Sequence, residues 1–345
     1  MTDDTTPPLI EARHVSRRFG AKPDLAAKIA IKLGLAKPPS TVHALDDVSL
    51  SIRKGEVVGL VGESGCGKST LGRVIAGILD PSEGQIVWKG RDRSALGASE
   101  RRASALATQM IFQNPMAALN PRMTIEDIVS EAPLTHGLVP KGERREYVDR
   151  YLQFAGFDPA LKNRYPHQFS GGQRQRVNIA RALAVQPDFL VCDESVAALD
   201  VSIQAQVINL FMELRERLDL TYLFVSHDLG VVEHISDRVA IMYLGRIVEE
   251  APVEEVFQRP NHPYTQALLS EIPRIELTKR QFKAIQGELP SPLNPPKGCH
   301  FHPRCPFAME RCRTEAPMKV EVAPSHWSAC HLNTPSETEA HPAKR

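Results

Sequence analysis

The stretch GESGCGKST at residues 62–70 constrains the fold of this chain more than any other feature. It fits the pattern G-x-x-x-x-G-K-[ST] and follows a short apolar run, EVVGLVG, at 56–62. A helical pattern then extends from Lys68 to Leu79. A buried strand, a glycine-rich turn and a helix in this order are typical of the opening of a parallel α/β sheet. We therefore expect an α/β fold with a phosphate-binding loop.

This loop is suited to hold a nucleotide. Glycines let several backbone N–H groups point at one phosphate, and the helix N-terminus adds the positive end of its dipole. Lys68 is expected to neutralise the β- and γ-phosphates, and the Ser69 hydroxyl to bind Mg²⁺. The predicted nucleotide-binding residues of the loop are Gly62, Glu63, Ser64, Gly65, Cys66, Gly67, Lys68, Ser69 and Thr70.

An acidic pair follows a second buried-strand candidate, Phe189–Asp193. Asp193 and Glu194 would stand at the carboxyl end of that strand, where open α/β sheets hold ligands. Asp193 is placed to hold Mg²⁺. Glu194 is placed to deprotonate the attacking water, a general-base role worth about 10²–10⁴-fold in rate. Alone, such a pair is more often a helix cap, but the upstream phosphate loop favours catalysis.

Hydrophobic periodicity predicts the remaining organisation. Between residues 99 and 184 the pattern is mostly helical, with breaks at the prolines at positions 115, 121, 133 and 140. Apolar residues from Val207 to Leu218 form one helix face. Further strands are expected at 48–52, at 85–88 (antiparallel, beside the 56–62 strand), at 221–227, at 238–243 and at 245–248.

Charge and hydropathy restrict the functional class. The chain has 345 residues, with 42 Lys+Arg against 41 Asp+Glu, and a formal net charge of +1. This balance gives no support for a nucleic-acid partner. No apolar run approaches the roughly 20 residues that span a bilayer, and the acidic, polar N-terminus is not a secretory signal. We expect a cytosolic chain whose membrane role, if any, comes through partners.

Six motifs in order resemble the ATP-binding subunits of ABC transporters. FSGGQRQR at 169–176 resembles the family's signature sequence, with Phe169 where Leu is typical. Gln113 matches the Q-loop, and His227 in FVSHD matches the switch histidine. SVAALD at 195–200 resembles the D-loop, with Asp200 at its end and Ala where Ser is usual. Phe19 occupies the place of the aromatic residue that stacks on adenine; the phosphate loop and the acidic pair complete the set.

This resemblance implies a P-loop NTPase of ABC type, with a parallel core sheet, an antiparallel β subdomain and a helical signature subdomain. It implies Mg²⁺ held through Ser69, Gln113 and Asp193, and catalysis by Glu194, His227 and Gln113. It also implies that two chains pair head to tail around ATP, so that the signature of one contacts the ATP of the other. The signature residues are Ser170, Gly171, Gly172 and Gln173.

The C-terminal part of the sequence restricts the resemblance to one group of ABC transporter ATPases. NHPYTQALLSEIP at 261–273 and GELPSPLNPPKGCHFHPRCPFAMERC at 287–312 resemble the C-terminal extension of oligopeptide/dipeptide importer ATPases, specifically the second of their two ATPases. We expect an ATP-binding domain at 1–258, with its helical subdomain at about 100–184, and a C-terminal domain at 259–345. Implied partners are a related ATPase in a heterodimer, two membrane permeases and an extracytoplasmic binding protein. The implied location is peripheral, on the cytoplasmic face of the inner membrane.

Four late cysteines suggest a metal site. In a reducing compartment, clustered cysteines indicate metal ligation before disulfides. Their number suits a [4Fe–4S] cluster or a zinc site, although the spacing is unlike the C-x₂₋₄-C pairs of zinc. The resemblance implies an iron–sulfur cluster of structural role, with zinc or no metal as alternatives. The proposed ligands are Cys299, Cys305, Cys312 and Cys330.

Several alternatives remain open from sequence. The substrate could be peptides, or nickel, opines, glutathione or oligosaccharides, which relatives import. A soluble ABC ATPase acting on ribosomes or DNA is disfavoured by the single nucleotide module and the lack of sustained heptads. A subunit that binds ATP without hydrolysing it is disfavoured by Glu194 and His227. A possible inserted helix at 21–41 is either a surface helix or a contact for a membrane or partner.

Overall fold

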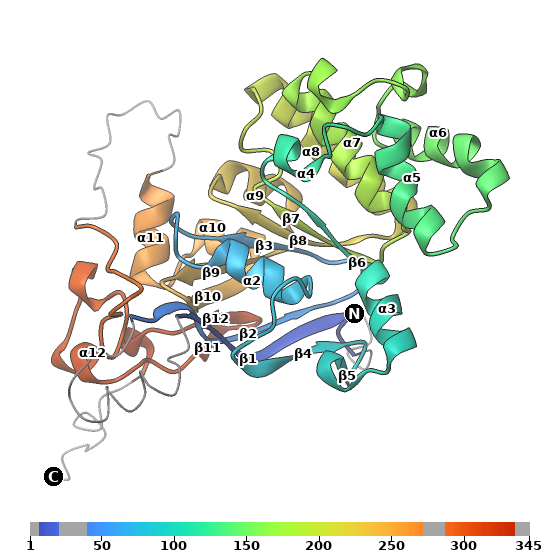
Figure 1. Ribbon diagram of the computed structural model, residues 1–345. Helices are drawn as coiled ribbons and strands as arrows, with labels where there is room; N and C mark the ends of the chain where they lie inside the picture. Colours follow the sequence, from blue (N-terminus) through green and yellow to red (C-terminus); the bar gives the residue numbers. More distant parts are fainter. Residues whose placement is uncertain (1–6, 21–39, 272–286, 335–345) are drawn as a thin grey trace, which may run out of the picture.

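Two β-sheets organise the computed structural model, which describes residues 7–20, 40–271 and 287–334 (Figure 1). The larger sheet has the order β11-β12-β10-β9-β3-β8-β7-β6, and the smaller one the order β2-β1-β4-β5. The predicted inserted helix at 21–41 lies almost wholly outside the described residues. Within the described part of the chain, no helix is both long and apolar enough to cross a membrane.

The centre of the larger sheet is parallel, as expected. Its strands are β9 (Arg238–Tyr243), β3 (Val57–Val61), β8 (Thr221–Ser226), β7 (Phe189–Asp193) and β6 (Thr108–Ile111). Every residue of β3, β7 and β8 is buried. Strands covered on both faces need continuous apolar sequence, which is why these three were recognisable as apolar runs.

Antiparallel strands extend this sheet and form the smaller one. In the larger sheet β9 is followed by β10 (Arg246–Pro252), β12 (His326–Ser328) and β11 (Val320–Ala323). The last two strands come from the C-terminal extension, so that part of the extension continues the sheet. The smaller sheet contains β2 (Val42–Ile52), β1 (Ile10–Phe19), β4 (Glu83–Trp88) and β5 (Arg91–Asp92).

The first long helix after the phosphate loop, α2 (Lys68–Ile75), lies between the two sheets (Figure 1). Its buried residues Leu71, Val74 and Ile75 share one core with apolar residues of β1, β2, β3 and β7. Covering one face of the parallel sheet in this way fixes the direction in which the helix N-terminus, and therefore the loop before it, points.

The helices between β6 and β7 form a lobe of their own, whereas the helix between β5 and β6 lies beside β4 and β5 (Figure 1). The remaining α-helices, in chain order, are α3 (Ala98–Ala107), α4 (Pro115–Ala118), α5 (Ile125–Thr135), α6 (Arg144–Phe154), α7 (Gly171–Leu183), α8 (Val201–Leu218), α9 (Leu229–Ile235), α10 (Val253–Gln258), α11 (Pro263–Ser270) and α12 (Glu310–Thr314). Short 3₁₀ helices occupy Arg93–Ala95, Lys141–Glu143, Pro159–Leu161, Pro166–Gln168, His302–Arg304 and His331–Asn333.

Two sequence expectations for the cassette were wrong in detail, and one short strand was missed. Thr108–Ile111 forms strand β6 within the region predicted to be mostly helical, because these four residues pair with β7. Pro133 lies inside α5 and does not break it, since the helix ends two residues later and loses only one internal hydrogen bond. Strand β4 is antiparallel, but it pairs with β1 and β5 rather than with β3.

An aromatic cluster fastens the extension to the cassette. Phe301 is 1% exposed, and its ring centroid lies 5.2 Å from that of Tyr243 on β9 and 5.4 Å from that of Tyr264 on α11. The Tyr243 and Tyr264 rings lie 4.7 Å apart. Edge-to-face packing of this kind stabilises beyond the area buried. The boundary at 258/259 stays a prediction, but the two sides of it share one core.

We expect Phe301→Ala to destabilise the protein by about 3–5 kcal/mol, because it removes a fully buried ring and leaves a cavity between two tyrosines. Urea unfolding of the full chain would measure this change. Phe307→Ala is the matched control, since Phe307 is 55% exposed and its truncation should cost about 0.5 kcal/mol or less. Equal losses in the two variants would contradict the role assigned to the cluster.

Candidate functional site

The phosphate loop is held in shape by close approach to neighbouring backbone. Gly67 has φ +110°, and a Cβ there would lie 2.3 Å from the carbonyl oxygen of Ala44. A Cβ on Gly62 would lie 2.1 Å from the carbonyl oxygen of Met242. Larger residues at these positions would push the loop away from β2 and β9. The loop therefore keeps a path that wraps backbone N–H groups around a small volume at the start of α2.

Lys68 is positioned inside this loop. Its side chain is buried, and Nζ donates to the carbonyl oxygens of Gly62 at 2.7 Å and Glu63 at 3.0 Å. These two bonds satisfy a buried ammonium group that would otherwise be costly. They also hold its charge at the centre of the loop, where an incoming phosphate would meet it.

Ser69 and Asp193 form the oxygen pair predicted to bind a metal ion. The Ser69 hydroxyl donates to Asp193 Oδ1 at 2.8 Å. Burial raises the pKa of Asp193 above its ordinary value, and the Ser69 hydrogen bond opposes that shift. A buried carboxylate beside a hydroxyl has the hard oxygen ligands that Mg²⁺ prefers, and a bound cation would compensate for the burial.

Glu194 lies between the two other predicted catalytic side chains. Gln113 Nε2 donates to Glu194 Oε2 at 2.5 Å, and His227 Nδ1 lies 3.5 Å from Glu194 Oε1. The three residues directly follow or closely follow β7, β6 and β8, whose parallel pairing places these ends at one edge of the sheet. Glu194 itself adopts a left-handed φ of 45°, and its N–H donates to Val225 O at 2.9 Å. This conformation turns the side chain out of the strand and towards the pocket.

One pocket collects most of the predicted nucleotide-binding residues. Among the described residues, its lining consists of Phe19, Val42, Ala44, Ser64, Gly65, Gly67, Lys68, Ser69, Thr70, Gln113, Glu194 and Pro292. Phe19 is 38% exposed, which leaves part of its ring free for a ligand, and the Arg17 guanidinium lies 4.7 Å from the ring centroid. Val42, Ala44 and Pro292 were not predicted, and no local sequence signal marks them, because only the fold brings them here.

Two residues of the loop point elsewhere. Cys66 is 1% exposed, and burial raises the pKa of its thiol. The N–H and the carboxylate of Glu63 contact the C-terminal extension, while its carbonyl oxygen accepts from Lys68. Both residues therefore contribute to the loop through its backbone and its packing.

The signature residues form a second potential anion site, outside this pocket. Ser170 caps α7: its hydroxyl accepts the Gln173 N–H at 3.3 Å, and Gln173 Oε1 accepts the Ser170 N–H at 3.1 Å. Ser170 and Gly171 are exposed, and so is Asp200 at the start of α8. Phe169 is buried against Phe157, so its replacement of the usual Leu is accommodated by aromatic packing. Exposure of these residues leaves them accessible to another chain.

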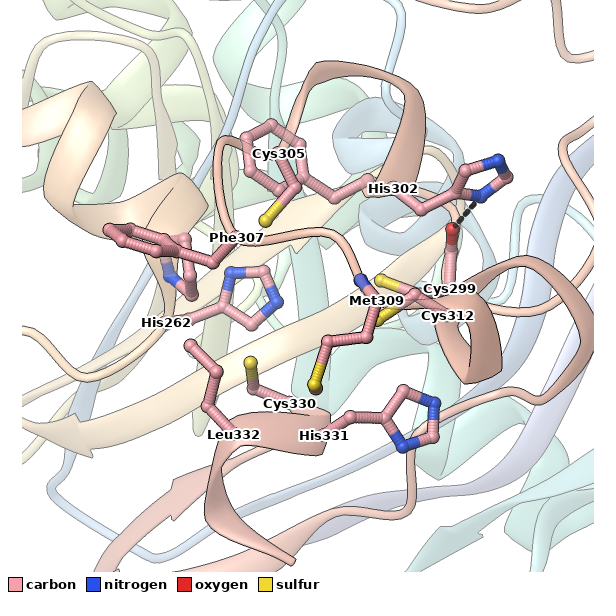
Figure 2. A pocket seen from close by; sticks show the side chains of 12 residues that line it. His262, Cys299, His302, Cys305, Phe307, Met309, Cys312, Cys330, His331 and Leu332 are labelled. Carbon is pink, nitrogen blue, oxygen red and sulfur yellow. Dashed lines mark hydrogen bonds between the residues drawn. The ribbon is translucent and has the colours of Figure 1, made fainter. Parts of the chain in front are cut away.

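The four late cysteines line one pocket but do not form a ligand set (Figure 2). Within the described ranges, no group of three or more His, Cys, Asp or Glu residues could hold a metal ion. The thiols project from different segments, and the Cys299 N–H donates to the Cys312 carbonyl oxygen at 2.9 Å. Burial raises the pKa of Cys299 to about 11, so its neutral thiol is favoured. The iron–sulfur cluster that the resemblance implies is not assembled in the described structure, and it stays a prediction.

Histidines beside these cysteines are occupied with other partners. His302 Nδ1 is 2.8 Å from Cys299 O, and His331 Nε2 is 2.9 Å from Glu315 O. His262 Nδ1 accepts the Tyr264 N–H at 3.0 Å. One engaged nitrogen leaves the other ring nitrogen available to a metal, but among the described residues no Cys/His group that could hold zinc is assembled.

Comparison with known proteins agrees with this geometry. Residues 45–197 match the family "ABC transporter", and residues 248–312 match "Oligopeptide/dipeptide transporter, C-terminal region". The chain is 50% identical over 336 residues to the "Oligopeptide transport ATP-binding protein AppF" of Bacillus subtilis, covering 96% of this chain and 99% of the relative. It is 49% identical to the same organism's "Putative oligopeptide transport ATP-binding protein YkfD", covering 87% and 92% of the two chains.

A solved structure resembles the cassette portion. The dimeric post-hydrolysis state of the ATP-binding cassette MJ0796, bound to ADP and Pi, superposes with a TM-score of 0.60 at 28% identity. The match covers 71% of this chain and 98% of that one. The extension at the C-terminus of this chain is therefore additional to a cassette of that kind.

We expect Ser69→Ala to abolish most of the Mg²⁺ dependence of ATP binding. Alanine lacks the hydroxyl that stands beside Asp193, so affinity with Mg²⁺ should fall about tenfold. In EDTA the change should be about twofold or less. Titration of the full chain with a fluorescent ATP analogue would measure both values. Ser69→Thr, which keeps the hydroxyl, should retain most of the dependence; an equal loss in EDTA would exclude the metal role.

Proposed function

Because the chain belongs to the ATP-binding proteins of the oligopeptide/dipeptide ABC transporter family, we propose that it hydrolyses ATP to drive the import of di- and oligopeptides. The proposed ATP hydrolysis rests on the position of Glu194, which lies between Gln113 and His227 and lines the phosphate-loop pocket. A carboxylate in that place can orient and deprotonate a water molecule. The peptide part rests on the likeness of the whole chain, extension included, to oligopeptide transport proteins.

Within the pocket, each residue has a proposed role. Phe19 stacks on adenine, and the loop residues 62–70 bind the phosphates. Lys68 exchanges its bonds to the loop carbonyls for bonds to the β- and γ-phosphates. Ser69, Gln113 and Asp193 would hold Mg²⁺, which when bound neutralises charge on the phosphates. Glu194 accepts the proton of the attacking water, and His227 fixes the water beside the γ-phosphate.

Closure of a dimer links hydrolysis to transport. We propose that Ser170, Gly171, Gly172 and Gln173 bind the ATP held by a partner subunit, with Asp200 close to the interface. The exposure of Ser170 and the cap at the start of α7 support this role. Such a switch works because ATP binds the closed state more tightly than the open one. The relative MJ0796 forms a dimer with nucleotide, which is consistent with this arrangement.

The proposed assembly contains a second related ATPase, two permeases and an extracytoplasmic binding protein, at the cytoplasmic face of the inner membrane. Gln113 lies where β6 leads into the helical lobe, so movement of its side chain towards Mg²⁺ would be passed to that lobe. The permeases and the binding protein, which this chain does not contain, would select the substrate. Nickel, opines, glutathione and oligosaccharides are the alternative cargoes.

We expect Glu194→Gln to abolish peptide uptake by the assembled transporter. Loss of the general base should lower ATP hydrolysis by about 100-fold or more while ATP binding persists. Uptake of labelled di- and oligopeptides, in cells lacking this gene and complemented with each variant, would measure the effect. Glu213→Gln is a matched control, because Glu213 is an exposed residue of α8 that pairs with exposed Arg217. Failure of the wild type to restore any peptide uptake would contradict the peptide substrate.

For the extension, we propose that Cys299, Cys305, Cys312 and Cys330 hold a structural [4Fe–4S] cluster. What supports this is that all four thiols line one pocket in a proline-rich segment with little apolar periodicity. The proposed cluster has a structural role, so no step of hydrolysis is assigned to it. Hydrolysis is accounted for by the cassette residues alone.

Metal analysis would test this second proposal. We expect anaerobically purified full-length protein to contain about four iron and four sulfide per chain, and Cys312→Ser to lower both. The thiols must lose protons to bind iron, so the amount of iron bound per chain should fall as the pH is lowered. Zinc without sulfide would favour the alternative, a zinc site formed by these cysteines. Absence of both metals would exclude a metal role for these cysteines.

A further inference from the structure

The phosphate loop has a direct link to the C-terminal extension through Glu63. The Glu63 N–H donates to the Tyr264 hydroxyl at 3.0 Å. Arg304 Nη1 lies 2.9 and 3.1 Å from the two Glu63 carboxylate oxygens. Tyr264 is on α11, and Arg304 ends the 3₁₀ helix His302–Arg304, directly before Cys305. Residues about 200 or more positions later in sequence therefore bind the backbone and the side chain of one loop residue.

Arg304 is itself held firmly. Only 6% of its side chain is exposed, so water screens the ion pair poorly. Nη1 also donates to the Tyr243 hydroxyl at 3.4 Å, and the guanidinium lies 5.8 Å from the centroid of the Tyr243 ring. Tyr243 belongs to β9, which is part of the central sheet. Tyr243 thus joins the Glu63–Arg304 pair to the central sheet of the cassette.

The chemistry of the loop makes an acidic residue there a liability. The loop binds an anion, yet Glu63 places a carboxylate on it, and the Glu63 carbonyl oxygen contacts Lys68 Nζ at 3.0 Å. A free carboxylate on this short loop could compete with phosphate for Lys68 and for the loop N–H groups. In the structure the carboxylate is instead turned towards the extension and neutralised there.

A second contact brings the extension to the same pocket. The His43 N–H donates to Pro292 O at 2.9 Å, and Pro292 lines the pocket together with Phe19. The extension therefore borders the nucleotide site both at the phosphate loop and beside the ring proposed to stack on adenine. The extension therefore contacts the cassette at the nucleotide site itself, which a domain attached elsewhere would not do.

We propose that Arg304 is a positioning residue of the nucleotide site: it holds the Glu63 carboxylate away from the phosphates and so makes ATP affinity depend on the extension. This inference rests on the ATP-binding part of the proposed function and is independent of the transported substrate. Arg304 acts through Glu63 and takes no part in the chemistry of hydrolysis.

A double-mutant cycle on the full chain tests the inference, with Mg²⁺–ATP binding as the readout. We expect Arg304→Met to weaken ATP binding about tenfold, since it frees the carboxylate. In the Glu63→Gln background, the same Arg304→Met change should cost about twofold or less, because the neutral amide competes poorly for Lys68. Arg304→Lys should fall between wild type and Arg304→Met, because it keeps a positive charge but not the position of Nη1, which contacts both Glu63 oxygens.

Arg311→Met provides the matched control. Arg311 is another partly buried arginine of the extension, but its guanidinium bonds Thr334, at 3.2 Å from its carbonyl and 2.9 Å from its hydroxyl oxygen. We expect its loss to leave ATP affinity within about twofold of wild type. If Arg311→Met weakens binding as much as Arg304→Met, the effect comes from the folding of the extension and the inference is wrong.

The remaining outcomes are also decisive. Wild-type affinity in Arg304→Met, or an equal loss with and without Glu63→Gln, would overturn the inference while leaving ATP binding intact. If Arg304→Met does not fold, Arg304→Lys in the two Glu63 backgrounds gives the same comparison. Failure of the wild-type chain to bind ATP would instead contradict the proposed function.

Discussion

Parallel pairing of β3, β7 and β8 is the constraint on which the rest of this structure depends. The three strands are buried along their full lengths and run in one direction, so their carboxyl ends meet at one edge of the sheet. The phosphate loop follows β3, the acidic pair ends β7, and the switch histidine follows β8. Groups that lie more than a hundred residues apart in sequence therefore come within hydrogen-bonding distance, as Ser69 and Asp193 do at 2.8 Å.

The extension is joined to this sheet by buried polar groups as well as by aromatic packing. Glu249 on β10 is 0% exposed, and its carboxylate accepts the N–H groups of Asn261 and His262 at 2.7 and 2.9 Å. His326 Nε2 on β12 lies 2.7 Å from the same carboxylate. A buried carboxylate is tolerated only when such partners satisfy it. Glu249 thus joins the start of α11 and the strand β12 to the cassette. Phe301 packs against Tyr243 of β9 and Tyr264 of α11.

These attachments give the extension a structural reason to affect the nucleotide site. Tyr264, Phe301 and Arg304 form a continuous path from the extension core to Glu63 of the phosphate loop. These side chains pack against one another, and close-packed interiors transmit small shifts from one side chain to the next. A change in the cysteine-bearing segment that displaces Arg304 would therefore reach the loop directly. Among the described residues, the path involves no part of the helical lobe, so it is separate from the route proposed to link Gln113 with the permeases.

Local sequence was sufficient for the central strands, the phosphate loop and the residues at the strand ends, because buried parallel strands and their glycine-rich turns carry signals within a few residues. It was insufficient for β6, a four-residue edge strand with one neighbour, and for the sheet to which β4 belongs. It also gave no arrangement for the four cysteine side chains, which line one pocket without forming a metal-binding group among the described residues. Sequence spacing limits how close two side chains can come, but it does not orient their thiols.

The sequence by itself determined the class of fold, the nucleotide site and the family, since these depend on residue types at short spacings. Only the tertiary structure decided that Pro292 borders the nucleotide pocket, that β11 and β12 extend the main sheet, and that Glu63 faces Arg304 rather than the phosphates. The segments joined to the cassette in this way lie roughly 80 to 270 residues apart. The physical basis of these relations is the packing of one surface on another, and no local pattern of hydrophobicity or charge records it.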